Sequence, residues 1–325
     1  MLAIGMDLGG TAVKAVVIDH YGNVLKTMSK PLGQHATSID EWNWKGVVKS
    51  VAADLMEEFK GRITAMGMSA PGICNEENTA IYSMPGRFYG LEKFIWSDYL
   101  DHETWILNDA HSALMAEAQF GAAKGYKHAI LLTLGTGVGG GIIIDGKLLQ
   151  GRNMMAGHLG HITVDADNPE LDIFKIPGSI EDHIGNATIE KRTYNRYQAT
   201  HELEAAYRAG DPVATYVWLS SVRKLSIAMC SLINALSPEV FVLGGGIAQA
   251  GDSLMKPLAA FMEIHEWRPR GEGVPVLLAH HGEHAGRLGQ RRLRFGRARN
   301  RVLEFYVLSC TQSFRHVQNC VQLKT

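Results

Sequence analysis

The sequence lacks the features that mark several classes of protein. It has 4 cysteines in 325 residues, without the dense spacing of a disulfide-stapled domain or a C-x-x-C metal pair. No apolar run approaches the length that spans a bilayer, and the first residues, MLAIGMDLGG, lack the basic segment, apolar core and small-residue site of a signal peptide. We therefore expect a cytoplasmic protein with no membrane partner.

The chain also lacks an excess of charge of either sign. Lys and Arg total 32 and Asp and Glu total 33, so the overall charge does not favour binding to nucleic acid. The length and the 46% hydrophobic content suffice for two globular domains, each with its own core. Any partners must therefore be recognised by local sites.

A glycine-rich stretch, LGTGVGGG at 134–141, has the glycine spacing of a dinucleotide-binding fingerprint. That fingerprint requires a strand before it and a helix after it. Residues 128–133 read as the strand, but 142–148 are β-branched and turn residues that indicate a second strand and a hairpin. This argues against an NAD-dependent dehydrogenase, while a glycine turn between strands can still approach a phosphate.

The first part of the chain alternates short apolar runs and turns. Residues 2–28 predict a three-stranded antiparallel meander. The spacing at 38–60 predicts an amphipathic helix that ends at Gly61. Strands are expected at 63–69 and 104–107 and a helix at 110–120, with a poorly defined stretch at 75–101.

The second part repeats this plan. Residues 128–149 read as strand, glycine turn and strand, and a loop-rich insert follows at 151–186. A long helix is expected at 211–236, with Asp211 as its N-cap and Pro212 at its first position, and a strand at 239–243. We therefore expect two α/β domains of similar plan that face each other across a cleft.

The first hairpin carries residues suited to a nucleotide phosphate and Mg²⁺. Asp7 ends one strand and would face the hydrated metal, the amides of Gly9 and Gly10 and the Thr11 hydroxyl would face oxygens, and Lys14 offers a countercharge. The alternative is an ordinary β-turn with two glycines. Two further glycine clusters favour the nucleotide interpretation, and their residues are Gly135, Thr136 and Gly137, and Gly244, Gly245 and Gly246.

Six motifs occur in the order seen in the ROK family of sugar kinases and related repressors, over residues 1–289. They are DLGGTAVK, Pro-Gly at 71–72, Asn-Asp-Ala at 108–110, LGTGVGGG, AGHLGH at 156–161 and LGGGI at 243–247. The resemblance implies a two-lobed, actin-like or hexokinase-type ATPase fold of ribonuclease H-like domains with a central cleft, which binds ATP and Mg²⁺. It implies lobes at 1–110 and 111–289 and a tail at 290–325 that returns to the first lobe. The glycine cluster at 244–246 would approach adenosine.

Within this resemblance Asp109 is the candidate catalytic residue. It follows a strand and can accept the proton of a sugar hydroxyl that attacks the γ-phosphate. The alternative role for Asp109 is the N-cap of the helix from Ala110. Asn108 offers a donor and an acceptor to another sugar hydroxyl.

The sugar-binding stretch departs from the family pattern. His158 stands where the family usually has glutamate, so the pocket would tolerate a different hydroxyl pattern, and we do not expect glucose to be preferred. Many members bind zinc through C-x-C-G-x-x-G-C-x-E and a histidine that matches His161. The corresponding run here, 172–181, retains the glycine and Glu181 but none of the three cysteines. We expect no structural zinc, sugar contacts from His158, His161 and Glu181, and an insert held by packing.

The ends of the chain give further expectations. Repressors of the family carry a helix-turn-helix domain before the kinase fold, and no such segment precedes the first strand here, so we expect no binding to operator DNA. The run GRLGQRRLRFGRARNR at 286–301 has two interpretations, a solvated or anion-binding basic face, or sequence read in the wrong frame. Dimers are common among members of the family, and nothing in the sequence shows an interface, so a homodimer is left open.

The leading hypothesis is an ATP-dependent sugar kinase that phosphorylates the 6-hydroxyl of a hexose or hexose derivative. The alternative is a catalytically weak sugar sensor of the same fold, in which sugar binds without ADP release.

Overall fold

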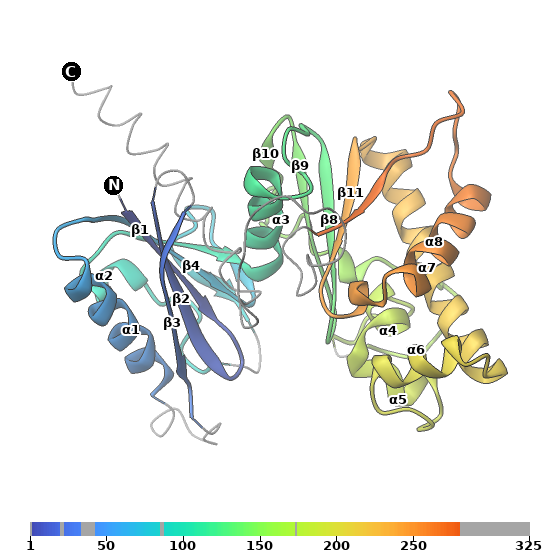
Figure 1. The fold of residues 1–325 in the computed structure, drawn as a ribbon, viewed down its shortest axis with the longest axis horizontal. Coiled ribbons are helices and arrows are strands. Elements are labelled where there is room, and N and C mark those ends of the chain that lie inside the picture. The colour runs from blue at the N-terminus through green and yellow to red at the C-terminus, as the bar shows by residue number, and fades with distance from the viewer. Residues whose placement is uncertain (1, 20–22, 34–42, 85–87, 173, 280–325) are drawn as a thin grey trace. The chain divides into compact units, whose positions relative to one another are not determined.

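The computed structural model describes residues 2–19, 23–33, 43–84, 88–172 and 174–279. These residues form two compact units (Figure 1). The first contains the described residues up to Gly121 together with Gln150–Met155, and the second contains Ala122–Leu149 and the described residues from Ala156 onward. The expected C-terminal tail lies outside the described residues.

The first unit is built on a five-stranded sheet with the order β3-β2-β1-β4-β7. Strands β1, β2 and β3 are antiparallel, which confirms the expected meander, and β4 and β7 continue the sheet parallel to β1. The strands are β1 (Leu2–Leu8), β2 (Ala12–Asp19), β3 (Val24–Pro31), β4 (Ile63–Ala70) and β7 (Thr104–Asn108). The carboxyl ends of β1, β4 and β7 therefore lie along one edge of the sheet.

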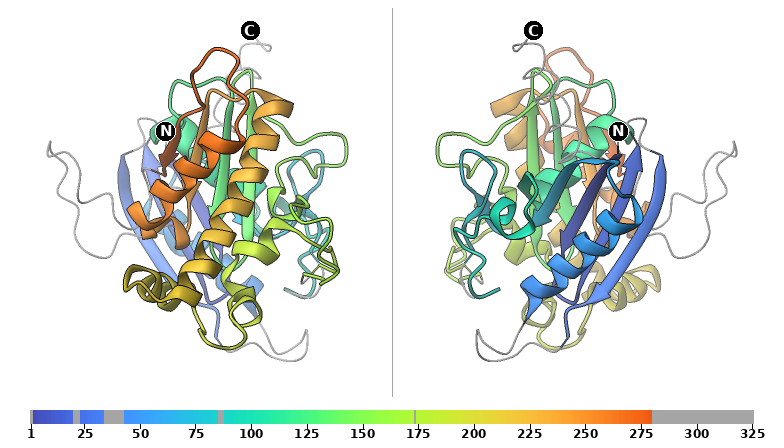
Figure 2. Two further views of the ribbon diagram at one scale, coloured as in Figure 1. Left: turned by 90° about the vertical axis from the view of Figure 1, so that its right-hand side faces the viewer. Right: turned by 90° about the vertical axis from the view of Figure 1, so that its left-hand side faces the viewer.

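Helix α1 (Trp44–Glu58) lies across one face of this sheet (Figure 2). The side chain of Asn43 caps its first turn by accepting a hydrogen bond from Gly46 N at 3.0 Å. Its buried residues, spaced three or four apart, join the core of the unit, as the periodicity predicted. The helix ends at Glu58 rather than at Gly61, and residues 38–42, with which the expected helix began, lie outside the described residues.

The stretch at 75–101, which the sequence left undefined, contains regular structure. It holds strand β6 (Ile81–Ser83), which pairs with β5 (Ile73–Cys74) just before the stretch, and helix α2 (Trp96–Leu100). Trp96 is fully buried and packs edge-on against Phe94, with 4.8 Å between ring centroids. Helix α3 (Asp109–Phe120) starts directly after β7.

The second unit repeats the plan of the first. Its sheet has the order β10-β9-β8-β11-β12, with antiparallel β8, β9 and β10 and parallel β8, β11 and β12. The strands are β8 (Ala129–Leu134), β9 (Val138–Ile144), β10 (Lys147–Leu148), β11 (Val240–Gly244) and β12 (Val276–Leu278). The expected strand after Gly141 is therefore confirmed, and no helix starts there.

Helices α7 (Pro212–Leu236) and α8 (Asp252–His265) cover one face of this sheet (Figure 2). The Asp211 side chain accepts a hydrogen bond from Ala214 N at 2.8 Å, and Pro212 occupies the first helical position. The predicted cap and both ends of this helix are confirmed.

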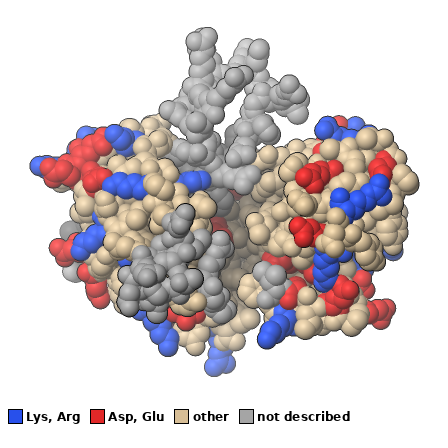
Figure 3. Space-filling model, turned by 90° about the horizontal axis from the view of Figure 1, so that it is seen from below, with Lys and Arg blue, Asp and Glu red and all other residues tan. Residues whose placement is uncertain are grey.

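The insert contains short helices rather than loops alone. They are η1 (Leu159–His161) and α4 (Ile180–Ile184), and η2 (Asn186–Thr188), α5 (Ile189–Arg192) and α6 (Thr200–Arg208) connect the insert to α7. Acidic and basic side chains are interspersed on the face of each unit drawn in Figure 3. Among the described helices, none is long and apolar enough to cross a membrane.

Candidate functional site

Polar side chains gather at the carboxyl edge of the first sheet. The strand registers place Asp7 of β1 beside Ser69 of β4, and Ala70 beside Asn108 of β7. In parallel α/β sheets this edge is where ligands bind. The first unit therefore brings Asp7, Asn108 and Asp109 to one region.

Asp7 is part-buried and is held by a neighbouring strand. Ser69 Oγ, itself buried, donates a hydrogen bond to Asp7 Oδ1 at 2.7 Å. Desolvation raises the pKa of Asp7 to about 6, with a smaller raising effect of the Asp109 charge, while Ser69 and Lys14 oppose the rise. Ser69 was missed by the sequence analysis, because a serine within an apolar strand carries no signal of its partner.

The turn after Asp7 is tight and partly exposed. Gly9 N donates to the carbonyl of Ala12 at 3.2 Å, and Thr11 is exposed. Neither Gly9 nor Gly10 has a left-handed φ, so the ordinary-turn interpretation, which used glycine for that conformation, does not explain these two residues. Lys14 lies opposite Asp7 in the β1 and β2 register.

At the start of α3, Asn108 and Asp109 have different roles, since Asn108 caps the helix and Asp109 is its first residue. Asn108 is the N-cap, and its Oδ1 accepts hydrogen bonds from Ala110 N at 3.0 Å and His111 N at 3.3 Å. Its Nδ2 donates to the carbonyl of Gly72 at 3.0 Å, which ties the Pro-Gly motif to this site. The capping role considered for Asp109 is therefore wrong, and most of the hydrogen-bonding capacity expected of Asn108 for a sugar is used inside the protein.

Asp109 is the first residue of α3 and is exposed, although its neighbours Asn108 and Ala110 are buried. Its Oδ1 accepts a hydrogen bond from Ala110 N at 2.8 Å. The partial positive charge of a helix N-terminus stabilises a negative charge placed at this position. An ionised, exposed carboxylate at this edge can accept a proton.

In the second unit, the turn between β8 and β9 is held from outside the hairpin. Asn186 N donates to the carbonyl of Gly135 at 2.9 Å, and Ala187 N donates to that of Thr136 at 2.8 Å. Asn186 Oδ1 also accepts from Thr200 N at 2.7 Å, which links the hairpin to α6. The sequence analysis missed Asn186, since nothing in its local pattern indicates a distant turn.

Glu181 of α4 lies against the same hairpin. Its Oε2 accepts a hydrogen bond from Val138 N at 2.8 Å, and a Cβ at Gly137 would collide with its carboxylate. Burial raises the pKa of Glu181, although the bond from Val138 opposes the rise. The structure thus places Glu181 beside Gly137, which the sequence assigned to phosphate rather than to sugar.

Glu181 Oε1 and His161 Nδ1 are among the buried polar atoms of this unit that have no hydrogen-bond partner among the described residues. Buried polar atoms are nearly always satisfied in native proteins, so such atoms indicate a ligand or ordered water. His161 belongs to η1, and His158 is the residue immediately before it, with His158 O accepting from His161 N at 3.4 Å. The three expected sugar residues therefore lie in the same unit.

The cluster Gly244, Gly245 and Gly246 follows β11. Gly245 has φ +87°, and a Cβ there would collide with the backbone of Leu134 in β8. The close approach of Gly245 to the backbone of β8 therefore explains why glycine is needed at this position. This explanation does not depend on the expected contact with adenosine. Gly246 caps η3 (Ile247–Ala250) with an ordinary helical φ of −64°.

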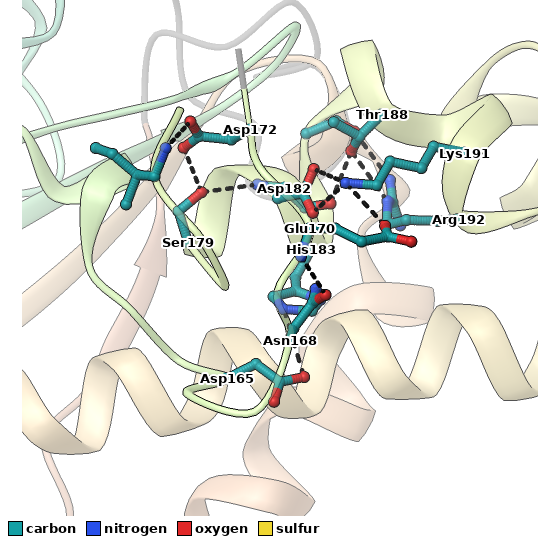
Figure 4. A network of polar contacts seen from close by, with 12 residues as sticks. Asp165, Asn168, Glu170, Asp172, Ser179, Asp182, His183, Thr188, Lys191 and Arg192 are labelled. Carbon is teal, nitrogen blue, oxygen red and sulfur yellow. Dashed lines mark hydrogen bonds and ion pairs between the residues drawn. The ribbon is translucent and has the colours of Figure 1, made fainter. Parts of the chain in front are cut away.

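The insert is held by the expected packing of Leu159, Ile180 and Ile184 in the core and also by hydrogen bonds to a buried carboxylate. Asp172 accepts hydrogen bonds from Phe174 N at 2.8 Å and Ile176 N at 2.9 Å. It also accepts one from Ser179 Oγ at 2.6 Å (Figure 4). Within the described ranges, no group of three or more His, Cys, Asp or Glu side chains could hold a metal ion.

The two units have the same strand order, and each has a glycine turn between its first two strands. This arrangement defines the fold class of the protein. The fold is the α/β, two-lobed, actin-like ATPase fold of the hexokinase type. The chain belongs to the ROK family, whose model matches residues 3–295.

Individual relatives agree with this assignment. The chain is 30% identical to the glucokinase of Thermotoga maritima over 279 residues, which cover 78% of this chain and 85% of that protein. It is similar to the ROK hexokinase of Thermus thermophilus, with a TM-score of 0.76 and 26% identity over 97% of this chain and 100% of the other. The Streptomyces griseus ROK glucokinase in complex with glucose and AMPPNP gives a TM-score of 0.70 and 26% identity, with 96% and 100% covered.

Proposed function

We propose that this chain is an ATP-dependent sugar kinase that transfers the γ-phosphate of ATP to a hydroxyl group, the 6-hydroxyl of a hexose or hexose derivative. Family membership and the glucokinase relatives support the sugar kinase class. The relative solved with glucose and AMPPNP supports ATP as the phosphate donor.

The observation that carries the proposal is the pair of carboxylates at the edge of the first sheet. Asp109 is exposed at the start of α3, and its charge raises the pKa of Asp7, so the two groups interact. Phosphoryl transfer to an alcohol requires a base for the hydroxyl proton and a site for the metal that accompanies ATP. Asp109 and Asp7 supply these two functions from one unit.

In this mechanism Asp109 accepts the proton of the attacking hydroxyl as the bond to phosphorus forms. Asp7 is suited to Mg²⁺, because an ion that keeps most of its water needs only one or two protein carboxylates besides the ATP phosphates. When bound, Mg²⁺ would neutralise charge on the phosphates. We assign phosphate contacts on this turn to the Gly10 amide and the Thr11 hydroxyl, because Gly9 N already donates to the carbonyl of Ala12.

The sugar side of the proposal is supported by the unpartnered Glu181 Oε1 and His161 Nδ1. A sugar hydroxyl can donate to the first atom and can donate to or accept from the second. His158, in place of the usual glutamate, would favour a hydroxyl pattern other than that of glucose. Since the preferred sugar is open, the activity assay uses a panel of five possible acceptors, namely glucose, mannose, fructose, N-acetylglucosamine and N-acetylmannosamine.

The test is ADP release with Mg-ATP over this panel for the native protein, Asp109→Asn and Asp101→Asn. Loss of a positioned base lowers turnover by about 10² to 10⁴, and we expect this for Asp109→Asn. Asp101 is exposed in the same unit at φ +51°, where asparagine is accommodated, so Asp101→Asn should retain native turnover.

Two other results of this assay would contradict the kinase assignment or the role of Asp109. Sugar binding by calorimetry without ADP release on any acceptor would reject the kinase and favour the sugar sensor. Equal turnover in native protein and Asp109→Asn would reject Asp109 as the base and leave the kinase assignment in place.

A further inference from the structure

The sugar-side segments of the second unit depend on one buried carboxylate. Asp172 is 7% exposed and receives three hydrogen bonds, two from backbone N–H groups and one from Ser179 Oγ. The bond with Ser179 is drawn in Figure 4. Although desolvation opposes the change, these bonds lower the pKa of Asp172. Asp172 is therefore a stable anion that closes the loop from 172 to 179.

One branch of this arrangement leads to Glu181. Ser179 is fully buried, donates its hydroxyl hydrogen to Asp172 Oδ2, and is the N-cap of α4, where its oxygen accepts from Asp182 N at 3.3 Å. Glu181 is the second residue of this helix. The position of its carboxylate beside Gly137 is thus coupled to the bond between Asp172 and Ser179.

The other branch leads to His161. The Phe174 backbone is held by Asp172, and the Phe174 ring lies edge-on to the His161 ring, with 4.9 Å between centroids and 77° between planes. The ring contact restrains the imidazole whose Nδ1 lacks a partner among the described residues. Asp172 is therefore linked to both groups that the proposed function assigns to the sugar.

The same four positions, 172, 174, 179 and 161, are those that hold zinc in the family members described above. Here they do not fit that ion. Phe174 has no donor atom, and the Ser179 hydroxyl and the Asp172 carboxylate are bonded to each other. The four side chains instead contact in two pairs, one through a hydrogen bond and one through aromatic rings.

We propose that Asp172 is a positioning residue for sugar recognition, which orients Glu181 through Ser179 and His161 through Phe174 without a structural metal. The inference rests on the proposed function, because it assigns sugar contact to these two residues. It predicts that Asp172 affects the binding of sugar and leaves the binding of ATP unchanged.

The far side of α4 has an independent attachment, so loss of the Asp172 bond should not unfold the unit. Asp182 is 2% exposed and accepts two hydrogen bonds from Lys191 Nζ, at 3.0 and 2.8 Å. Lys191 also pairs with Glu170 at 3.0 Å (Figure 4). A variant at position 172 therefore releases one side of the helix only.

The experiment compares Asp172→Asn, Ser179→Ala and the double variant with Asp167→Asn. Asp167 is an exposed carboxylate in the same segment and serves as the matched control. A lost charge-assisted hydrogen bond predicts about tenfold weaker sugar binding by calorimetry and a similar rise in KM for sugar. KM for ATP should change less than about twofold, and the double variant should lose less than the sum of the two single losses, because both substitutions weaken the bond between positions 172 and 179.

A second readout does not require a sugar. In Asp172→Asn, hydrogen exchange should be faster at 159–161 and 180–184 and unchanged in β8, whereas Asp167→Asn should match native protein. Unchanged exchange at both segments would overturn the proposal, as would native sugar affinity in Asp172→Asn or stoichiometric zinc whose chelation weakens sugar binding. If native protein neither binds nor phosphorylates any sugar of the panel, the proposed function fails and the exchange result still decides whether Asp172 positions the two segments.

Discussion

Replacing Asp7 by asparagine should make the protein more stable and less active. The pKa of Asp7 is raised from 3.8 to about 6 by desolvation, so the native state favours its neutral form. The native pKa lies above the unfolded one, so the stabilisation is fully present below about pH 4 and is lost as the pH rises through about 6. Asparagine is neutral throughout and can still accept the hydrogen bond from Ser69.

The magnitude follows from the two pKa values. Their difference is about 2, and each unit corresponds to about 1.4 kcal/mol, so ionised Asp7 costs the native state about 3 kcal/mol at neutral pH. Urea titrations should show Asp7→Asn unfolding with a free energy about 3 kcal/mol larger than native protein near pH 8 and nearly equal to it near pH 4. Asp101→Asn is the control for the substitution itself.

The same variant should lose its response to the nucleotide. Native protein should gain stability with Mg-ATP by mass action, about 2.7 kcal/mol at a hundredfold excess over the dissociation constant, and Asp7→Asn should gain far less. A stability difference that does not change with pH, or a variant less stable than native protein near pH 8, would refute the reasoning about Asp7.

Two further substitutions test single contacts. Ser69→Ala removes the hydrogen bond that lowers the pKa of Asp7, so the acid limb of the pH profile of kcat/KM should move to higher pH, and an unchanged limb would contradict this role. Gly178 has φ +64°, and a Cβ there would collide with the carbonyl of Asp165, so Gly178→Ala should lower the free energy of unfolding by about 1 to 3 kcal/mol more than Gly146→Ala. Gly146 has φ +73° with open space around it, so equal losses in thermal unfolding would show that φ rather than the collision matters.

The sequence alone determined the helix ends and hairpins that depend on interactions between residues close together in the chain. The Asp211 and Pro212 start signal gives α7 its first residue, because an N-cap side chain bonds to a backbone N–H within its own turn. The alternation of apolar runs and turns gives the antiparallel hairpins of both units, since neighbouring strands joined by a short turn have few other arrangements. Motif order identified the family, and through it the two-lobed fold.

Tertiary structure decided which side chains meet. The partner of Asp7 is Ser69, 62 positions away on β4, and only the pairing of β1 with β4 brings them together. Asn108 and Asp109 are neighbours, and either side chain is of a type that can cap a helix. The hydrogen bond from Asn108 to the carbonyl of Gly72 holds Asn108 at the N-cap position and leaves Asp109 exposed. Side-chain partners distant in sequence have no local periodicity to reveal them.

In the insert, too, the sequence predicted part of the structure and the fold decided the rest. The absence of cysteines at positions 172, 174 and 179 was visible in the sequence, and with it the lack of a thiolate zinc site. What closes the loop instead was not visible, because an aspartate and a serine seven positions apart are common in solvated loops. Only the folded insert buries Asp172 with its three donors, and burial away from water makes those bonds strong enough to order the chain around Glu181.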